Sequence, residues 1–226
     1  MPLLTALEED AFKELFNLSF GKVASTLSEM VDAEVTLSPP FYCSLPGSSV
    51  AEYIQSLFGA EIGLVGMRYQ FEFPSDQIID GNLFQIWPDH TIDGMAVLMI
   101  RDTEMGHFLD ALYGEHIPEE QLFQVEEETL QLAGDVLLYT CTSSLSTLFA
   151  SEIHCEKPQF FKGAPEELLS FLALSDTQDG GENLLLRVNF SLIDKEVAGS
   201  MLTWMGGSGV PRLKAELNQF VAMYMA

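Results

Sequence analysis

The chain repeats its own pattern after an interval of 118 residues, and this internal duplication constrains the fold more than any other feature. When residues 10–40 are aligned with residues 128–158, five of the 31 positions are identical: Ser25/Ser143, Leu27/Leu145, Ser28/Ser146, Glu34/Glu152 and Pro40/Pro158. Self-similarity at a fixed interval is typical of two copies of one supersecondary unit. We therefore expect a single domain, residues 1–226, built of repeats at about 1–117 and 118–226.

Each repeat is expected to begin with a long helix, which is followed by strands and a closing helix. Thr5 and Glu8 have the spacing of a capping box, and the apolar residues that follow recur every three or four positions, which predicts a helix over 6–31. Apolar runs separated by turn-forming residues predict the other elements: a β-segment at 33–37, a helix at 50–58, strands at 60–73 and 92–101, a helix at 103–113, a second-repeat helix at 166–171, strands at 184–192 and 197–205, and a final helix from about 211.

No Gly/Ser-rich or Pro-rich connector divides the two repeats, so we expect them to share one sheet rather than to form separate beads. In the strand part the two repeats align only when a gap is introduced, and this alignment makes Gly94 equivalent to Gly199. The predicted fold class is α+β: a tandem duplication of a helix-plus-strands repeat with pseudo-two-fold symmetry, whose mainly antiparallel sheet is flanked by helices.

Charge and cysteine usage exclude several functional classes. Ten Lys and Arg stand against 34 Asp and Glu, a formal net charge of −24, so we expect no nucleic-acid partner, because such binding rests on basic patches. The stretch 132–151 carries Asp135 and a polar run, which favours a buried helix over membrane insertion, and with no signal-like start we expect a cytoplasmic protein. The cysteines (Cys43, Cys141 and Cys155) and the histidines lack metal-ligand spacing, so no metal site is expected.

The first helix carries one polar stripe opposite its apolar face. At 100° per residue, six residues share this stripe: Asp10, Glu14, Asn17, Gly21, Ser25 and Ser28. A carboxamide such as that of Asn17 can orient a water molecule without being ionised, and the carboxylate of Glu14 can bind a partner's Lys or Arg. The alternative is a plain solvated helix face, on which a Glu-x-x-Asn spacing is common.

The motif Asp10-x-x-x-Glu14-x-x-Asn17, followed after 22 residues by Pro40, resembles the signature D/S-x3-E-x2-N-x22-P of the CheC/CheX/FliY family of chemotaxis phosphatases. The stretch at 17–28, rich in Gly and Ala and ending in Leu-Ser, is similar to the family's sequence after the Asn. CheC-type members contain two such helices in a duplicated chain. The resemblance therefore implies a CheC-like fold over nearly the whole chain.

The second copy departs from the signature. At the offset of 118, the positions of Asp10, Glu14, Asn17 and Gly21 are taken by Glu128, Leu132, Asp135 and Tyr139, while Pro158 keeps the place of Pro40. Leu132 cannot form an ion pair, Asp135 would bring a negative charge near a phosphoryl group, and Tyr139 would crowd the stripe. We expect this second site to be degenerate and the apolar neighbourhood of 136–138 to serve packing.

By resemblance, the substrate is a phosphorylated CheY-like response regulator, whose phospho-Asp lies beside a Mg²⁺ in the receiver's own active site. No cofactor of the chain's own is implied. Asn17 would place a water molecule in line with the acyl phosphate, and Glu14 would pair with the receiver's phosphate-binding Lys. Asp10 would support the helix or make a rim contact.

The remaining stripe residues, Gly21, Ser25 and Ser28, would face the partner because their small side chains leave its approach open. Pro40 and Pro158 are expected to be structural. The alternative function is a non-catalytic CheC-like module that docks a receiver domain or a CheD-like deamidase in chemotaxis or two-component signalling. A flagellar-switch component is a third possibility, which the lack of an added switch domain disfavours.

Overall fold

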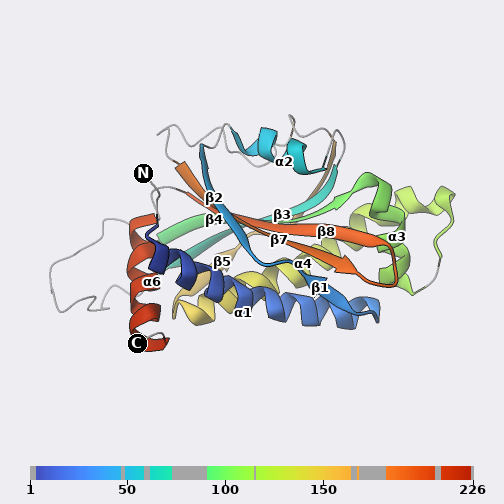
Figure 1. Ribbon diagram of the computed structural model, residues 1–226. Coiled ribbons are helices and arrows are strands. Elements are labelled where there is room, and N and C mark those ends of the chain that lie inside the picture. Colours follow the sequence, from blue (N-terminus) through green and yellow to red (C-terminus); the bar gives the residue numbers. More distant parts are fainter. Residues whose placement is uncertain are drawn as a thin grey trace.

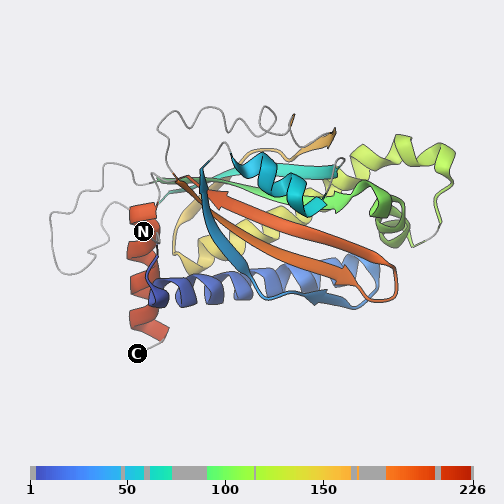
Figure 2. The ribbon, with the colours of Figure 1, turned by 45° about the horizontal axis from the view of Figure 1, so that its top comes forward.

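The computed structural model has three layers, with one sheet between helices (Figure 1). Helices α1 and α4 lie side by side beneath the sheet, α2 covers its other face, and α3 and α6 lie toward the two ends (Figures 1 and 2). The residues that the structure describes are 4–46, 49–58, 62–72, 91–114, 116–163, 167, 182–206 and 210–224.

The helices and strands follow one another in an order that nearly repeats. The first repeat contains α1 (Ala6–Val31), β1 (Val35–Leu37), β2 (Phe41–Pro46), α2 (Val50–Phe58), β3 (Ile62–Glu72), β4 (Thr91–Arg101) and α3 (Asp102–Tyr113). The second contains α4 (Glu119–Leu148), β5 (Glu152–Cys155), β6 (Gln159–Gly163), β7 (Glu182–Leu192), β8 (Val197–Met205) and α6 (Val210–Tyr224).

Eight strands of the described residues form one antiparallel sheet in which the two repeats exchange strands. The order is β1-β7-β8-β4-β3-β5, with β2 also on β7 and β6 also on β3. The hairpins β3–β4 and β7–β8 meet at the β4–β8 pair, where Gly94 lies opposite Met205 and Ile100 opposite Gly199. The two short strands of each repeat therefore pair with the hairpin of the other repeat, so the sheet contains strands of both repeats on each side of the β4–β8 pair.

Each pair of short strands is one strand interrupted by a bulge. Between Leu37, which pairs with Phe190, and Phe41, which pairs with Arg187, the edge chain has one residue more than its partner. The same excess occurs between the β3 pairings of Cys155 and Gln159. Pro40 and Pro158 directly precede the resumed strands. Because proline has no N–H for a ladder, an edge-strand bulge is a site where it is tolerated.

The ends of the two long helices repeat in atomic detail. The Ser28 hydroxyl donates to the carbonyl of Ala33 at 2.6 Å, and the Ser146 hydroxyl donates to that of Ser151 at 2.6 Å. Two residues in the left-handed region with φ 47° also correspond at an offset of 118: Asp32 and Ala150. This correspondence supports the alignment on which the predicted duplication rests.

The equivalence of Gly94 and Gly199 is also visible in the packing. A Cβ on Gly94 would lie 2.3 Å from the ring of Tyr69, its cross-strand neighbour, and one on Gly199 would lie 2.3 Å from the ring of Phe190, its own cross-strand neighbour. In both hairpins an aromatic ring covers the glycine opposite to it. The absence of a side chain at each glycine is what makes room for that ring.

Two apolar cores stabilise the layers. The larger core lies between the sheet and the helices beneath it and includes Phe12 and Phe16 of α1 and Leu137 of α4. The smaller one lies between the sheet and α2 and includes Ile54 and Trp204. Burial of such side chains contributes about 25 cal/mol per Å² of apolar area.

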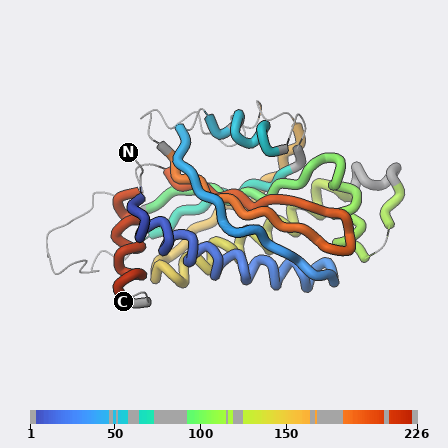
Figure 3. Tube along the Cα trace, viewed as in Figure 1, coloured from blue at the N-terminus to red at the C-terminus, as the bar shows by residue number. Residues whose placement is uncertain are grey.

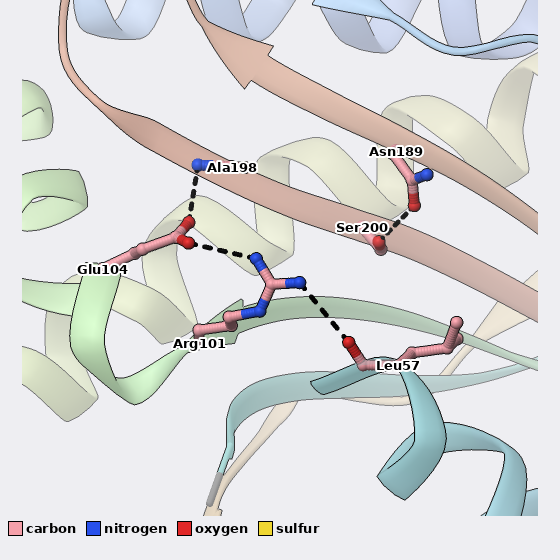
Figure 4. A network of polar contacts seen from close by, with 6 residues as sticks. All are labelled: Leu57, Arg101, Glu104, Asn189, Ala198 and Ser200. Carbon is pink, nitrogen blue, oxygen red and sulfur yellow. Dashed lines mark hydrogen bonds and ion pairs between the residues drawn. The ribbon is translucent and has the colours of Figure 1, made fainter. Parts of the chain in front are cut away.

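Charged side chains join the layers and the repeats. Arg101 donates to the carbonyl of Leu57 near the C-terminal end of α2 and pairs with Glu104, which accepts a hydrogen bond from the Ala198 amide of β8 at 2.7 Å (Figure 4). A cation near the last carbonyls of a helix interacts favourably with its dipole. Lys162 of β6 similarly pairs with Asp102 of α3 and Glu126 of α4.

The predicted fold class is confirmed, and the 6–31 helix has the expected limits. The sequence interpretation missed β2 and β6, because the prolines that precede them interrupt any strand pattern. The expected helix at 166–171 lies outside the described residues, except for residue 167. The boundary between repeats near residue 118 stays a prediction.

Candidate functional site on helix α1

Helix α1 is held at its first turn and along its buried face. The Glu8 amide donates to the Thr5 hydroxyl at 3.3 Å, and the Thr5 amide donates to the Glu8 carboxylate at 2.7 Å, which completes the predicted capping box. Aromatic rings along the buried face contact one another in succession in tilted pairs, with 4.6 Å between the centroids of Phe12 and Phe16 and 5.9 Å between those of Phe16 and Phe20. A helix fixed in this way presents its opposite face in a defined orientation.

That opposite face carries the predicted polar stripe. Asp10, Glu14, Asn17, Gly21 and Ser25 are all exposed. Glu14 and Asn17 are three residues apart, so their side chains emerge from neighbouring points of one face. Within the part of the chain that the structure describes, neither has a hydrogen-bond or ion-pair partner. Both side chains are therefore accessible to a partner molecule.

Gly21 leaves the stripe open beside Asn17. A Cβ built at Gly21 meets no atom within 4 Å. A glycine in the middle of a helix costs roughly 0.5–1 kcal/mol relative to alanine. Packing within the chain does not require a glycine at this position. The close approach of a partner's surface would explain why residue 21 has no side chain.

Ser28 differs from the rest of the stripe. It is half-buried and its hydroxyl donates to the Ala33 carbonyl, so it stabilises the end of α1. The structure thus gives Ser28 an intrachain bond, whereas Ser25, one turn earlier, is exposed.

The cation nearest in sequence to the candidate pair is already engaged. Lys13 pairs with Glu9 at 2.5 Å and lies over the ring of Tyr42, 5.6 Å from its centroid. Glu9 also accepts a hydrogen bond from the Tyr42 hydroxyl at 3.0 Å. The hydrogen bond from Lys13 holds the pKa of Glu9 below its usual value. Lys13 therefore belongs to this local network, and Glu14 remains available to an external cation.

The corresponding face of α4 is exposed as well. Glu128 and Asp135 are exposed, and so are the apolar side chains of Leu132 and Tyr139 (65% and 55% accessible). The expectation that the 136–138 neighbourhood serves packing holds for its two leucines, which are buried, but is wrong for Val136, which is 38% exposed. The helix points that side chain out of the core because it shares the angular position of the stripe.

Comparison with solved structures shows the fold. The chain is similar to FliY of Thermotoga maritima, with a TM-score of 0.66 and 15% sequence identity over 96% of this chain and 98% of that one. This chain has the CheC/CheX/FliY-type fold. No family model matches the sequence, and no curated protein matches it.

The CheC/CheX/FliY-type fold of this chain also resembles FliM domains in complexes with other proteins. The matches include the FliM–SpeE complex of H. pylori, at a TM-score of 0.55 with 10% identity over 97% of this chain and 99% of that one. They also include the H. pylori FliG–FliM complex, at 0.52 with 10% identity over 95% and 100%.

No group of three potential metal ligands occurs among the residues that the structure describes. A search of the same residues found no helix long and apolar enough to cross a membrane. The candidate functional feature of this fold is the exposed carboxylate and carboxamide pair of α1, Glu14 and Asn17. Sequence reasoning found that pair and placed Leu132 and Tyr139 at the equivalent positions of the second helix, but it missed the exposure of Val136. The available signal was the four-residue spacing between Leu132 and Val136, which places both side chains on one face of the helix.

Proposed function

We propose that the chain is a CheC-like phosphatase that hydrolyses the phospho-aspartate of a CheY-type response regulator. The observation that carries the proposal is the joint exposure of Glu14 and Asn17 on one face of α1, with open space at Gly21 beside them. The match of this face to the family signature and the FliY-like fold support it.

The chemistry assigned to the chain is positioning. The Asn17 carboxamide enters the receiver's active site, accepts a hydrogen bond from a water molecule and holds its oxygen in line with the phosphorus atom. As the new P–O bond forms, the bond to the receiver's Asp breaks, which releases inorganic phosphate and regenerates the carboxylate. A proton of the water passes to the phosphate or to solvent, so no ionised base of this chain is needed. The receiver's Mg²⁺ neutralises charge on the phosphoryl group.

Glu14 sets the register of docking in this proposal. Its carboxylate pairs with the receiver's phosphate-binding Lys, a charge-assisted contact that draws the Lys toward α1. Asp10 makes a rim contact one turn earlier, and Ser25 lies one turn beyond Gly21 without obstructing the approach.

The test compares five single variants in a phosphate-release assay with Mg²⁺ and receivers from the same organism. Asn17→Ala and Glu14→Ala remove the candidate pair. Glu52→Ala and Gln55→Ala are the matched controls, because these exposed residues have the same chemistry and three-residue spacing on α2, which covers the opposite face of the sheet.

We expect the wild type and both α2 variants to accelerate phosphate release, Asn17→Ala to fall to the receiver's own rate of decay, and Glu14→Ala to weaken apparent affinity. Gly21→Tyr, which copies the side chain of the equivalent position on α4, should obstruct docking without disturbing the core, because its Cβ meets open space. Equal activity of Asn17→Ala and the wild type contradicts the proposal.

The second candidate is a non-catalytic docking module, and the FliM-like neighbours favour it. Their structures include complexes with SpeE and with FliG, so a related fold binds other proteins. Receiver binding without any acceleration of phosphate release would select this candidate. Binding to a CheD-like deamidase instead of a receiver would indicate a docking module whose partner is the deamidase.

A further inference from the structure

Helix α4 carries an apolar stripe that the residues described in the structure leave exposed. Leu132, Val136 and Tyr139 are spaced four and three residues apart, so they lie on one face of the helix, and all three are exposed. The neighbouring Leu137 and Leu138 are fully buried, so α4 has a complete core-facing side without the stripe. Large apolar side chains gathered on an exposed face indicate an interaction surface.

The surroundings of this stripe are acidic. The sequence of α4 contains six acidic residues and not one Lys or Arg. Glu128 and Asp135 share the face of the stripe and are exposed. Pairing of this face with a second copy around a two-fold axis would bring like charges together, which disfavours self-association. A partner with an apolar patch bordered by Lys or Arg is electrostatically complementary.

The helix that carries the stripe packs against the helix that carries the candidate site. Helices α1 and α4 run antiparallel and pack side by side beneath the sheet (Figure 3). At the offset of 118, Leu132 and Tyr139 occupy the positions of Glu14 and Gly21, so the two exposed faces are related by the pseudo-two-fold symmetry. Packed helix axes are separated by about 8–10 Å, and a typical interface covers about 800 Å² on each partner. An interface of that size, centred on Asn17, extends onto α4.

We propose that Leu132, Val136 and Tyr139 form the apolar anchor for the same receiver domain whose phospho-Asp is presented to Asn17. This inference rests on the proposed function. The polar stripe of α1 provides the group that positions water and the group that orients the receiver. Most of the affinity of an interface comes from a few buried anchor residues, among which aromatic residues are enriched. The second repeat thus carries a binding surface where the first carries the reactive pair, and one partner occupies both long helices.

The test separates binding from turnover. Binding is measured by calorimetry with a receiver carrying Mg²⁺ and beryllofluoride, a stable mimic of its phosphorylated state, and turnover is measured by phosphate release at saturating receiver. The variants are Leu132→Ser, Tyr139→Ser and Asn17→Ala. The matched control is Ile193→Ser, which removes an equally exposed apolar side chain from the β7–β8 turn. Exposed substitutions of this kind change stability little.

We expect each α4 variant to raise the Kd about tenfold, which corresponds to about 1.4 kcal/mol, and to leave kcat within about twofold of the wild type. Asn17→Ala should show the opposite pattern, with kcat lost and the Kd little changed. Ile193→Ser should match the wild type in both measurements.

Three results would overturn the inference. If the wild type binds and hydrolyses but the α4 variants keep its Kd, the anchor is wrong and the proposed function stands. If no receiver binds the wild type, both fail together. If sedimentation shows a dimer that Leu132→Ser dissociates, the occupant is a second copy.

Discussion

The two glycines inside the long helices offer a test of how closely α4 packs on the sheet. A Cβ at Gly134 of α4 would lie 2.5 Å from Cγ1 and 2.8 Å from Cβ of Val65 on β3. A Cβ at Gly21 of α1 meets nothing within 4 Å. Replacing either glycine by alanine increases intrinsic helix stability by the same amount, about 0.8–1.0 kcal/mol. The difference between the two variants therefore isolates the cost of the contact with Val65.

Forcing an extra methyl group into a packed interface costs about 1–3 kcal/mol. We expect Gly21→Ala to raise the free energy of unfolding by about 0.8 kcal/mol and Gly134→Ala to lower it by up to about 2 kcal/mol. Their difference should be about 1–3 kcal/mol, or several degrees in Tm for a chain of this length. Urea unfolding at unchanged m-value measures it, because a changed m-value would report altered exposure of surface instead.

If both variants gain equal stability, α4 does not rest on Val65 as closely as described, and the stated basis for its position fails. If Gly21→Ala loses stability, the space beside Asn17 is not open. The second result would also remove the steric argument for docking at α1, because the glycine would then serve the fold of the chain itself.

Three further outcomes are expected. Thr5→Ala should lower the free energy of unfolding by about 1 kcal/mol in chemical denaturation, because it removes the N-cap, whereas Thr5→Ser should keep most of it. Burial raises the pKa of Asp110, but hydrogen bonds from the His116 ring and a backbone amide outweigh it and leave that pKa below its usual value of 3.8. The stability from ionised Asp110 is thus present above about pH 4 and is lost as the pH falls through the lower folded-state pKa. Asp110→Asn should therefore be less stable than the wild type at pH 7, and urea titrations should show this difference narrowing as the pH falls below about 4. Burial raises the pKa of Cys141 to about 12, so a thiol reagent at pH 8 should label Cys141 only after unfolding and the half-buried Cys43 before it; early labelling of Cys141 would contradict its burial.

The sequence determines local elements better than their partners. The 6–31 helix could be predicted with its limits because its capping box, Thr5 and Glu8, and its apolar period are local features of the sequence. The exchange of short strands could not, because Val35 and Phe41 find their pairing partners on β7, some 150 residues away. Nothing local to residues 33–46 distinguishes pairing with its own repeat from pairing with the other one, so the register is decided only when both hairpins meet.

The duplication itself carries information that single-helix reasoning discards. Taken alone, Leu132, Val136 and Tyr139 belong to an apolar stretch, and apolar residues in a long helix are assigned to the core. Taken with α1, each has an equivalent on or beside the polar face: Glu14 and Gly21 lie on that face, and Leu18 adjoins it and is exposed in the structure. Because equivalent helices pack the same face on a shared sheet, the exposure of the α1 stripe predicts the exposure of the α4 stripe whatever residues occupy it. An apolar residue at a position that symmetry assigns to solvent is therefore a stronger indication of a binding surface than hydropathy alone can give.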